Sequence, residues 1–338
     1  MKRYARTLAL LLLPAGSWAQ TPLPQLAVRP ISLPAELAYY DNQFSGLAIR
    51  QKALFLLSES RLQDKAEGKL YRIELADLER QLADTAYTLP YRKYPLVNLA
   101  VLQGKINAQN QEYEGLEALA FDGKQLYFSV ETTTLSPNCY LLKGTLQDSA
   151  VVLDTGFLLA LPKPTRPDGS HIYNAGFEAI SKDRNTLLSF FEYNYFDSQN
   201  YAYQHTLSAA ASPATALPLA RLPFRITDIT RTTGRHFTAI NYFFKGEGED
   251  TVYRTPATDP ASTALIRTGA AYHNYCRLVA IRRRGRELSW QPIGELPGPY
   301  MGYNWEGLAA HKKGYFLIND KYTPQKPFTS TLVYIRKP

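Results

Sequence analysis

The chain has 338 residues, of which 45% are hydrophobic and 20% charged, a balance that excludes a disordered or fibrous protein. Its formal net charge is +8, and residues 1–19 carry three positive and no negative side chains, so residues 20–338 are near +5. Much of that excess lies in one run at 282–286, which we expect at the solvated tip of a β-hairpin. A nucleic-acid-binding face would spread its basic residues over a surface and interleave them with aromatic residues. This single run does not, so we expect no nucleic-acid binding.

The N-terminus predicts export. Basic residues precede an apolar run at 8–13, and Ser17 and Ala19 place small side chains two positions apart, as a signal peptidase requires. The alternative is a membrane anchor, but the run is shorter than the ~20 residues that cross a bilayer, and Pro14 follows it at once. We expect a signal peptide over residues 1–19 and a secreted or periplasmic location.

The remainder, residues 20–338, is expected to be one domain, monomeric and without membrane contact after cleavage. Short alternating apolar runs separated by Gly and Pro predict an all-β fold, with one short helix at 75–85.

Five segments of the chain resemble one another. Each reads as an apolar strand, a polar turn and a second apolar strand, which predicts a β-hairpin. The segments are 44–60, 115–131, 176–192, 226–243 and 305–322. A third strand follows each of them, at 69–75, 139–146, 200–207, 276–283 and 331–337.

A fourth strand is expected to close four of the repeats, each time on a Leu-Pro pair. These pairs are Leu89-Pro90, Leu161-Pro162, Leu222-Pro223 and Leu296-Pro297. The last repeat lacks a fourth strand, and a matching segment stands at residues 25–34. We therefore predict a five-bladed β-propeller whose last blade is closed by an N-terminal strand, since radial packing buries both faces of each sheet. A β-sandwich is the alternative fold.

Alignment of the repeats places polar residues at two recurring positions. The start of each innermost strand carries Ser45, Glu117, Glu178, Asp228 and Glu306. The end of each second strand carries Glu59, Glu131, Glu192 and Asp320, with Tyr242 in the fourth repeat. Since the start of a hairpin and its end lie together, both sets converge on one face of the propeller.

Carboxylates gathered in this way repel one another unless they are protonated, paired with bases or neutralised by a cation. Because the donors are oxygens alone, Ca²⁺ is the expected ion, held by the first set of residues. The second set would hold or activate a water molecule. The alternative is that each acid accepts hydrogen bonds from backbone N–H groups of a neighbouring blade.

The longest connections reach the same face and carry basic residues. The linkers 91–113 and 163–174 and an insertion at 244–275 lie there, and His171 is a candidate for proton transfer. The expected cations at the rim are Arg61, Arg166, Lys245 and Lys321. Cations beside a metal site favour a small anionic or phosphorylated substrate.

Two cysteines, Cys139 and Cys276, begin third strands in repeats two and four. These repeats are not neighbours in a ring of five, so we predict that no disulfide joins them.

The ordered motifs SGL…SES, EGLEAL…SVE, NAGFEAIS…FFE, ITDI and NWEGLA…INDKY resemble the phytase-like family, named for an esterase-like activity of phytase. The resemblance spans roughly residues 44 to 336 and implies a secreted or periplasmic propeller with phosphoester hydrolase activity. The arrangement is also similar to calcium-activated nucleotidases, in which the axial channel holds calcium.

Three functions remain open from the sequence. The first is a Ca²⁺-dependent phosphoester hydrolase, and the second is a non-catalytic propeller that binds a ligand or partner. The third is a Ca²⁺-dependent esterase or lactonase that uses one acid as a general base.

Overall fold

The computed structural model describes residues 22–59, 68–207 and 213–337. The predicted signal peptide and Arg61 lie outside them. The fold is all-β, as predicted, and its strands form antiparallel four-stranded meanders. The first two contain β2 (Phe44–Arg50), β3 (Ala53–Ser58), β4 (Lys69–Glu74), β5 (Arg92–Val97), β6 (Tyr113–Asp122), β7 (Gln125–Thr132), β8 (Asn138–Leu146) and β9 (Val151–Pro162).

The remaining meanders follow in chain order. The next contains β10 (Ala179–Asp183), β11 (Thr186–Phe190), β12 (Tyr201–Thr206) and β13 (Thr215–Pro218). Another contains β14 (Arg225–Arg231), β15 (His236–Phe243), β18 (Tyr275–Arg284) and β19 (Glu287–Glu295). The last contains β20 (Trp305–His311), β21 (Gly314–Asn319), β22 (Leu332–Arg336) and β1 (Ala27–Ile31).

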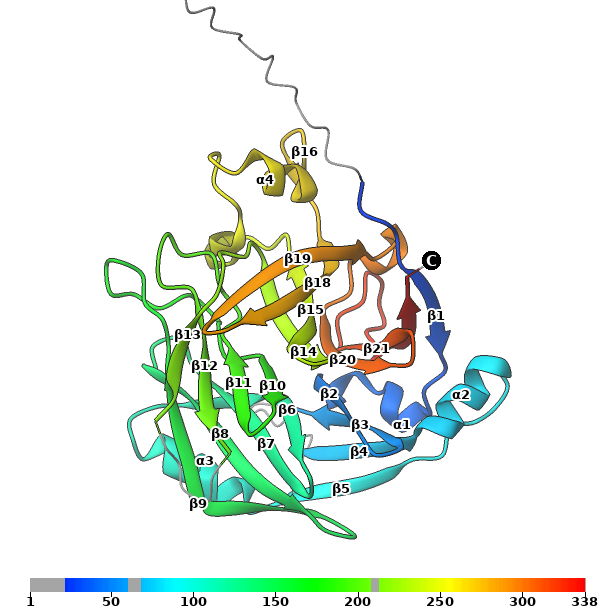
Figure 1. The fold of residues 1–338 in the computed structure, drawn as a ribbon. Coiled ribbons are helices and arrows are strands. Elements are labelled where there is room, and N and C mark those ends of the chain that lie inside the picture. Colours follow the sequence, from blue (N-terminus) through cyan, green and yellow to red (C-terminus); the bar gives the residue numbers. More distant parts are fainter. Residues whose placement is uncertain (1–21, 60–67, 208–212, 338) are drawn as a thin grey trace, which may run out of the picture.

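The first strands of the meanders form a closed ring. Strand β2 contacts β6 and β20, β6 contacts β10, β10 contacts β14, and β14 contacts β20. Figure 1 shows these strands around a common centre, with the later strands of each meander farther out. This radial arrangement is that of a β-propeller.

The N-terminal strand closes the ring as predicted. Strand β1 pairs antiparallel with β22, from Ala27 opposite Arg336 to Ile31 opposite Leu332. The outer edge of the last meander, which the C-terminal strand would otherwise leave open, is thereby covered.

Tight turns at the opposite ends of the hairpins explain why these segments fold as paired strands. Gly123 stands between β6 and β7 and Gly285 between β18 and β19, each at a positive φ near 60°, which hairpin turns of this length require. The basic run at 282–286 therefore lies at a hairpin tip, as expected.

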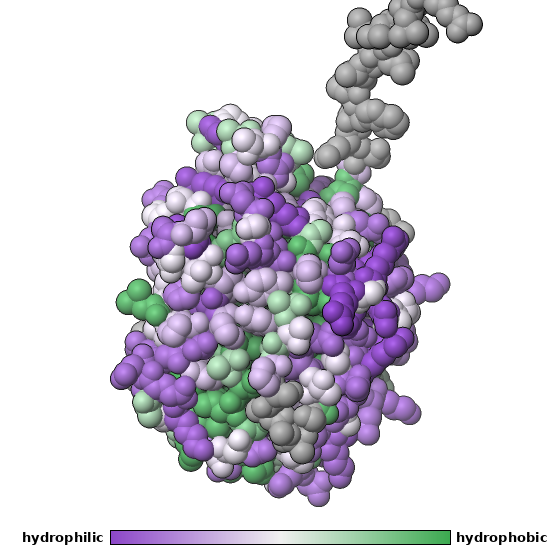
Figure 2. Space-filling view, turned by 60° about the vertical axis from the view of Figure 1, so that its left-hand side comes forward, coloured by the Kyte–Doolittle hydropathy of each residue, from purple (hydrophilic) through white to green (hydrophobic). Residues whose placement is uncertain are grey.

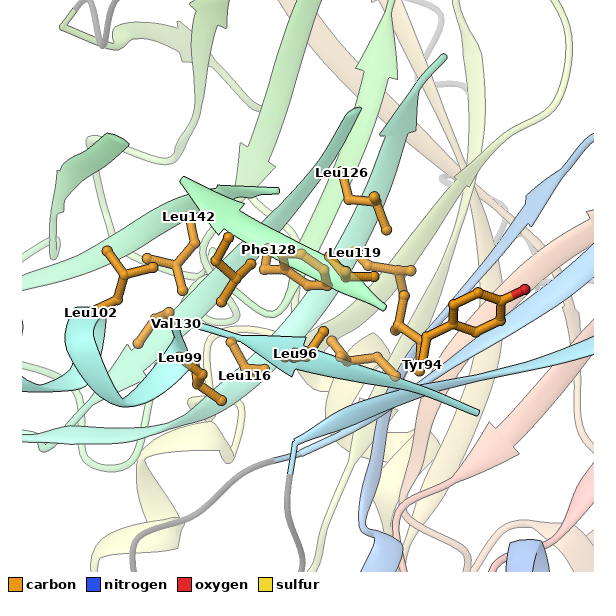
Figure 3. Packing of buried hydrophobic residues seen from close by; sticks show 14 of the residues in the cluster. Tyr94, Leu96, Leu99, Leu102, Leu116, Leu119, Leu126, Phe128, Val130 and Leu142 are labelled. Atoms are coloured by element: carbon orange, nitrogen blue, oxygen red, sulfur yellow. The ribbon is translucent and has the colours of Figure 1, made fainter. Parts of the chain in front are cut away.

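Apolar side chains fill the space between neighbouring meanders. In Figure 3, Leu116, Phe128 and Val130 from β6 and β7 pack against Leu96 of β5 and against Leu99 of α3 (Leu99–Asn107). Strands β5 and β9 also pair in parallel over two residues, so the first two meanders share one eight-stranded sheet.

Helices occupy the connections. The expected helix at 75–85 is α2 (Leu75–Ala83), whereas α3 was not expected within the linker 91–113. The predictions of fourth strands ending at Leu89-Pro90 and at Leu222-Pro223 are wrong, because β5 begins only at Arg92, after α2, and β13 already ends at Pro218. The short helices α1 (Ala35–Ala38) and η1 (Tyr40–Asn42) connect β1 to β2.

The insertion separates β15 from β18, as predicted, and projects at the top of Figures 1 and 2. It contains η2 (Gly248–Tyr253), α4 (Pro260–Ile266), β16 (Arg267–Thr268) and β17 (Ala271–Tyr272). The short helix η3 (Gly298–Tyr300) follows β19. Among the described residues, no helix is long and apolar enough to cross a membrane, and hydrophilic residues cover most of the face in Figure 2.

Cys139 and Cys276 are both buried and form no disulfide bond. They begin third strands of meanders that are not neighbours, as the sequence predicted.

Candidate functional site: a cluster of buried carboxylates

The aligned residues of the first strands lie at irregularities in strand pairing. The register shifts at Ser45 in β2, at Glu117 in β6, at Asp228 in β14 and at Glu306 in β20. Glu178 directly precedes β10. A bulge turns one side chain away from the regular alternation, so these residues can point toward the ring axis while their neighbours pack in the core.

The second aligned set lies at the ends of the second strands and is also buried. Glu131 is the penultimate residue of β7, and Glu59, Glu192 and Asp320 follow β3, β11 and β21. The exposed fractions of Glu131, Glu59, Glu192 and Asp320 are 2%, 3%, 0% and 6%, respectively. Because hairpin starts and ends meet, these acids lie at the same end of the propeller as the first set. We call this end the mouth.

Two glycines make room for the acids. A Cβ atom on Gly115 would clash with Glu59 and would stand 3.0 Å from Oε1 of Glu117. A Cβ atom on Gly176 would stand 3.1 Å from Cγ of Glu131. Glu59 and Glu117, from neighbouring meanders, therefore approach each other over Gly115, and Gly176 leaves room for Glu131.

Burial and mutual repulsion shift the acid–base behaviour of the cluster. Burial, and then the negative charges of Glu117 and Glu192 among others, raises the pKa of Glu131 well above its usual value. Burial, and then the neighbouring Glu192 and Glu306 carboxylates, does the same to the pKa of Glu178. Both carboxyl groups therefore favour their protonated forms at a pH where an exposed glutamate is charged.

One arginine supplies the main positive charge next to these acids. Arg225, the first residue of β14, places Nη1 2.8 Å from Oε1 of Glu192 and Nη2 3.4 Å from Oδ1 of Asp250. Its guanidinium also lies over the ring of Tyr253, 3.9 Å from the centroid. Burial opposes the charge of Arg225, but Glu192 and the other neighbours outweigh it and raise its pKa. The insertion, which supplies Asp250 and Tyr253, thus covers the arginine.

Lys163 adds a second cation near the cluster. It is 4% exposed and donates hydrogen bonds to the backbone oxygens of Thr132 and Thr133 at 2.7 and 2.9 Å. Its charge acts on Glu131 and lowers that residue's pKa against the larger effect of burial.

Asp228 and Ser45 connect neighbouring meanders through the backbone. Oδ2 of Asp228 accepts from the N–H of Leu308 at 2.6 Å and of Leu47 at 3.4 Å, and Oδ1 accepts from Ile229 at 2.7 Å. Ser45 donates to the oxygen of Leu116 at 2.6 Å. The contacts of these two residues therefore fit the alternative in which polar side chains form hydrogen bonds with backbone groups of neighbouring blades.

On the last meander, the acids contact polar side chains and the backbone. Asn304 donates a hydrogen bond to Oε1 of Glu306, and Oδ1 of Asp320 accepts from the N–H of Tyr322 at 2.7 Å. The ammonium of Lys321 donates to Oε1 of Gln43 at 2.6 Å.

Three of the residues expected at the rim, Arg166, His171 and Lys245, line two other cavities. Arg166 and His171 line one of about 610 Å³ between a loop after β9 and the insertion, and Nδ1 of His171 lies 3.4 Å from the oxygen of Pro164. Lys245 and His273 line one of about 790 Å³ between the insertion and the loop after β21. None of the clustered acids lines either cavity.

Sequence reasoning missed Arg225 as a site residue. The sequence feature that could have identified Arg225 is its position three residues before Asp228 in an innermost strand, where a charged side chain is unusual. Its partner Glu192 comes from the preceding meander, so the pairing depends on the packing of two blades.

The residues of the cluster can be compared with the ligands that Ca²⁺ requires. Among the described residues, no three His, Cys, Asp or Glu side chains already form a group that could hold a metal ion. The donor chemistry nonetheless fits, because the cluster offers carboxylate oxygens and no imidazole or thiol. The atoms of Asp228 and Ser45 are engaged with backbone, so Glu117, Glu178 and Glu306 would supply the carboxylates by turning about their flexible side-chain bonds.

Comparison with known proteins assigns no family. No family description and no curated protein matches the chain, so the phytase-like resemblance stays a prediction. Similar solved structures include the GH43_1 enzyme from Xanthomonas citri, at a TM-score of 0.48 and 9% identity over 92% of this chain and 90% of that chain.

Two further structures have comparable scores. The catalytic domain of the Coprinopsis cinerea GH62 alpha-L-arabinofuranosidase matches at 0.48 and 8% identity, over 93% of this chain and 98% of that one. A putative oxidoreductase (glucose dehydrogenase) from a Thermus species matches at 0.45 and 12%, over 92% and 99%. Similarity at this level says nothing about the activity of this chain.

Proposed function

We propose that this protein is an exported, five-bladed propeller that hydrolyses phosphoesters at its mouth with the help of calcium. Each antiparallel meander is one blade in this proposal, and residues 1–19 are its signal peptide. The single observation that carries it is the cluster of seven buried or half-buried acids at one end of the ring. These are Glu59, Glu117, Glu131, Glu178, Glu192, Glu306 and Asp320.

Such a cluster costs stability unless a cation or a proton offsets it. Arg225 pairs with Glu192 and Lys163 lowers the pKa of Glu131, yet burial and mutual repulsion still raise the pKa of Glu131 and of Glu178. Carboxyl groups with strongly perturbed pKa values cluster at functional sites. A divalent cation would offset the repulsion between the carboxylates and would link the blades that contribute its ligands.

Glu117, Glu178 and Glu306 would hold the ion, which supplies charge stabilisation to a phosphoryl oxygen when it is bound. The chain's own residues handle the proton. Glu131 keeps a proton to a higher pH than an exposed glutamate does, so it suits the role of a general acid toward a leaving oxygen. Glu192, fixed by Arg225, is positioned to accept a proton from water.

Basic side chains of the loops around the mouth would attract the anionic substrate toward it. Lys245 lines the cavity of about 790 Å³ beside the last meander, and Arg166 lines the cavity of about 610 Å³ on the other side of the insertion. Ion pairs with phosphate oxygens are stronger than neutral hydrogen bonds, so both favour phosphorylated over neutral esters.

The test is the melting temperature of the purified protein in calcium and in a chelator. A ligand that binds only the folded state stabilises it by RT ln(1 + [L]/Kd), about 2.7 kcal/mol at a hundredfold excess over Kd. Glu178→Gln should lose most of this gain. In chelator, the same variant should melt about 2 °C above wild type, because it removes a buried carboxyl group whose pKa is raised.

The matched control is Glu287→Gln, which removes an exposed carboxylate at the opposite end of the propeller. It should respond to calcium as wild type does. A wild-type melt that ignores calcium up to millimolar concentrations would show that the cluster is structural.

A panel of substrates then separates the remaining functions. Turnover of phosphoesters that Glu192→Gln abolishes while calcium still stabilises that variant supports the proposal. Turnover of carboxylic esters or lactones alone would point to an esterase, and calcium binding without any turnover would point to a binding protein.

A further inference from the structure

The end of the propeller opposite the mouth contains a second charged site, a cavity of about 860 Å³ between the first two meanders. Its wall includes Gln51 at the β2–β3 turn and Lys124 at the β6–β7 turn. Strand β2 begins at the mouth and β3 returns to it, so their turn lies at the far end. The cavity is therefore separate from the carboxylate cluster and independent of the proposed function.

Two arginines stand side by side in its wall. Arg72 of β4 lies directly opposite Arg92 of β5 in the strand register, so both side chains leave the sheet on the same side. Like charges at such positions repel each other and destabilise the strand pair. Arg72 pairs with Glu74 at 2.6 Å, while among the described residues no ion pair accompanies Arg92. The Nε atom of Arg72 is buried and, within the described part of the chain, has no hydrogen-bond partner.

Two more cations complete the wall. Arg50 donates from Nε to the oxygen of Gly123 at 2.6 Å, which holds it across the gap between the meanders, and its guanidinium lies 5.8 Å from the ring of Phe121. Lys124 is exposed beside it. Asp148 is the single acidic residue in the wall.

Aromatic residues of the core lie behind Tyr94, which lines the cavity. The ring of Phe55 lies 4.9 Å from that of Phe121 and 6.4 Å from that of Tyr94, and all belong to the core between the two meanders. The cavity therefore borders the apolar core between the two meanders at Tyr94.

We propose that this cavity, which we call the basic cavity, binds a small ligand that carries two or more phosphate groups. Four cations face two acids, Asp148 in the wall and Glu74 paired with Arg72, which leaves an excess of positive charge. A planar guanidinium pair suits the bidentate binding of phosphate oxygens. The volume lies within the range of small-molecule sites and exceeds what one phosphate fills. The bound anion offsets the repulsion between Arg72 and Arg92.

The experiment is calorimetric titration of the full chain with inorganic pyrophosphate, in a chelator so that calcium does not contribute. We expect saturable binding that weakens as salt rises. Arg92→Gln should weaken it about tenfold, since each charge-assisted contact is worth that much or more. Lys124→Gln should weaken it less, because lysine contributes a single point charge.

Two control variants make the test specific. Lys313→Gln removes an exposed cation from the β20–β21 turn, at the same end of another meander, and should leave binding unchanged. Glu178→Gln should also bind normally, because it alters only the mouth. No binding at millimolar pyrophosphate, or an equal loss in the Arg92 and Lys313 variants, would overturn the proposal. Orthophosphate that binds as tightly as pyrophosphate would overturn the requirement for two phosphate groups.

Discussion

The two ends of this propeller carry opposite charges in opposite settings. At the mouth, Glu131 and Glu192 are almost fully buried, whereas at the far end Arg92 and Lys124 are exposed. The same hairpins supply both ends, so the difference lies in the side chains and not in the backbone. Charges at the far end stay in water, while those at the mouth must be neutralised by the protein, a proton or a ligand.

This contrast shows that the burial of charged groups affects stability more than their number does. Burial raises the pKa of Glu131 and Glu178, and repulsion adds to it. Exposed cations at the far end repel each other through water, which screens them strongly. Substitutions at the mouth should therefore change stability greatly, and those at the far end should change it little.

The largest expected effect comes from the buried arginine at the mouth. Arg225→Met would leave Glu192, which is 0% exposed, without the guanidinium that lies 2.8 Å away. Removal of one partner from a buried pair costs about 4 kcal/mol, so the midpoint of urea unfolding should fall steeply. Arg225→Lys, which keeps the charge, should lose less. If both variants unfold like wild type, Glu192 is not held as a buried charge.

A buried histidine toward the far end should respond to pH in the opposite sense from the mouth acids. His205 of β12 is 4% exposed, and burial lowers its pKa to about 4. The unfolded chain takes up a proton near pH 6.5, so the stability that His205 contributes is present above that pH and lost as pH falls to about 4. The loss is about 3 kcal/mol at most.

Unfolding in urea at pH 7, 5.5 and 4 measures this loss. His205→Leu should remove this part of the decline, while Glu131 and Glu178, whose folded-state pKa values are raised, contribute stability that is lost as pH rises. An unchanged decline in the variant would place the acid sensitivity elsewhere.

The smallest expected effect is at the far end. Arg92→Gln removes an exposed side chain, so its unfolding free energy should stay within about 0.5 kcal/mol of wild type. A rise within that range is expected, since the variant relieves repulsion with Arg72. Equilibrium urea unfolding at low salt measures it, and a loss as large as that of Arg225→Met would abolish the contrast between the two ends.

Much of the fold could be predicted because strand pairing is largely local. Each hairpin and third strand is encoded by an apolar run and a turn, and the displaced strand at 27–31 follows from the count of strands per repeat. The helix α3 was missed although Leu99, Leu102 and Ile106 have helical spacing and are buried. The strand before Leu89-Pro90 was predicted from the position of that pair in the repeat, but α2 precedes the pair and the fourth strand follows it.

The site could be predicted only in its composition. The repeats align the acids, and the structure places those it describes at one end of the ring. The role of each acid depends on neighbours from other blades. Asp228 receives its N–H donors from Leu47 and Leu308, and Glu192 its arginine from the next meander. Such contacts join distant parts of the chain, and one sequence does not reveal them.

The pairing of β1 with β22 has a consequence for how the chain is made. Synthesis proceeds from the N-terminus, so β1 must wait without its partner until Leu332–Arg336 exist. The entropy of closing so large a loop grows only slowly with its length, so the delay itself adds little to the final cost. An incomplete chain, however, exposes the unpaired edges of β1 and β21, and such edges join other polypeptides. During synthesis, therefore, the strand that closes the finished ring can instead pair with a second nascent copy of the chain.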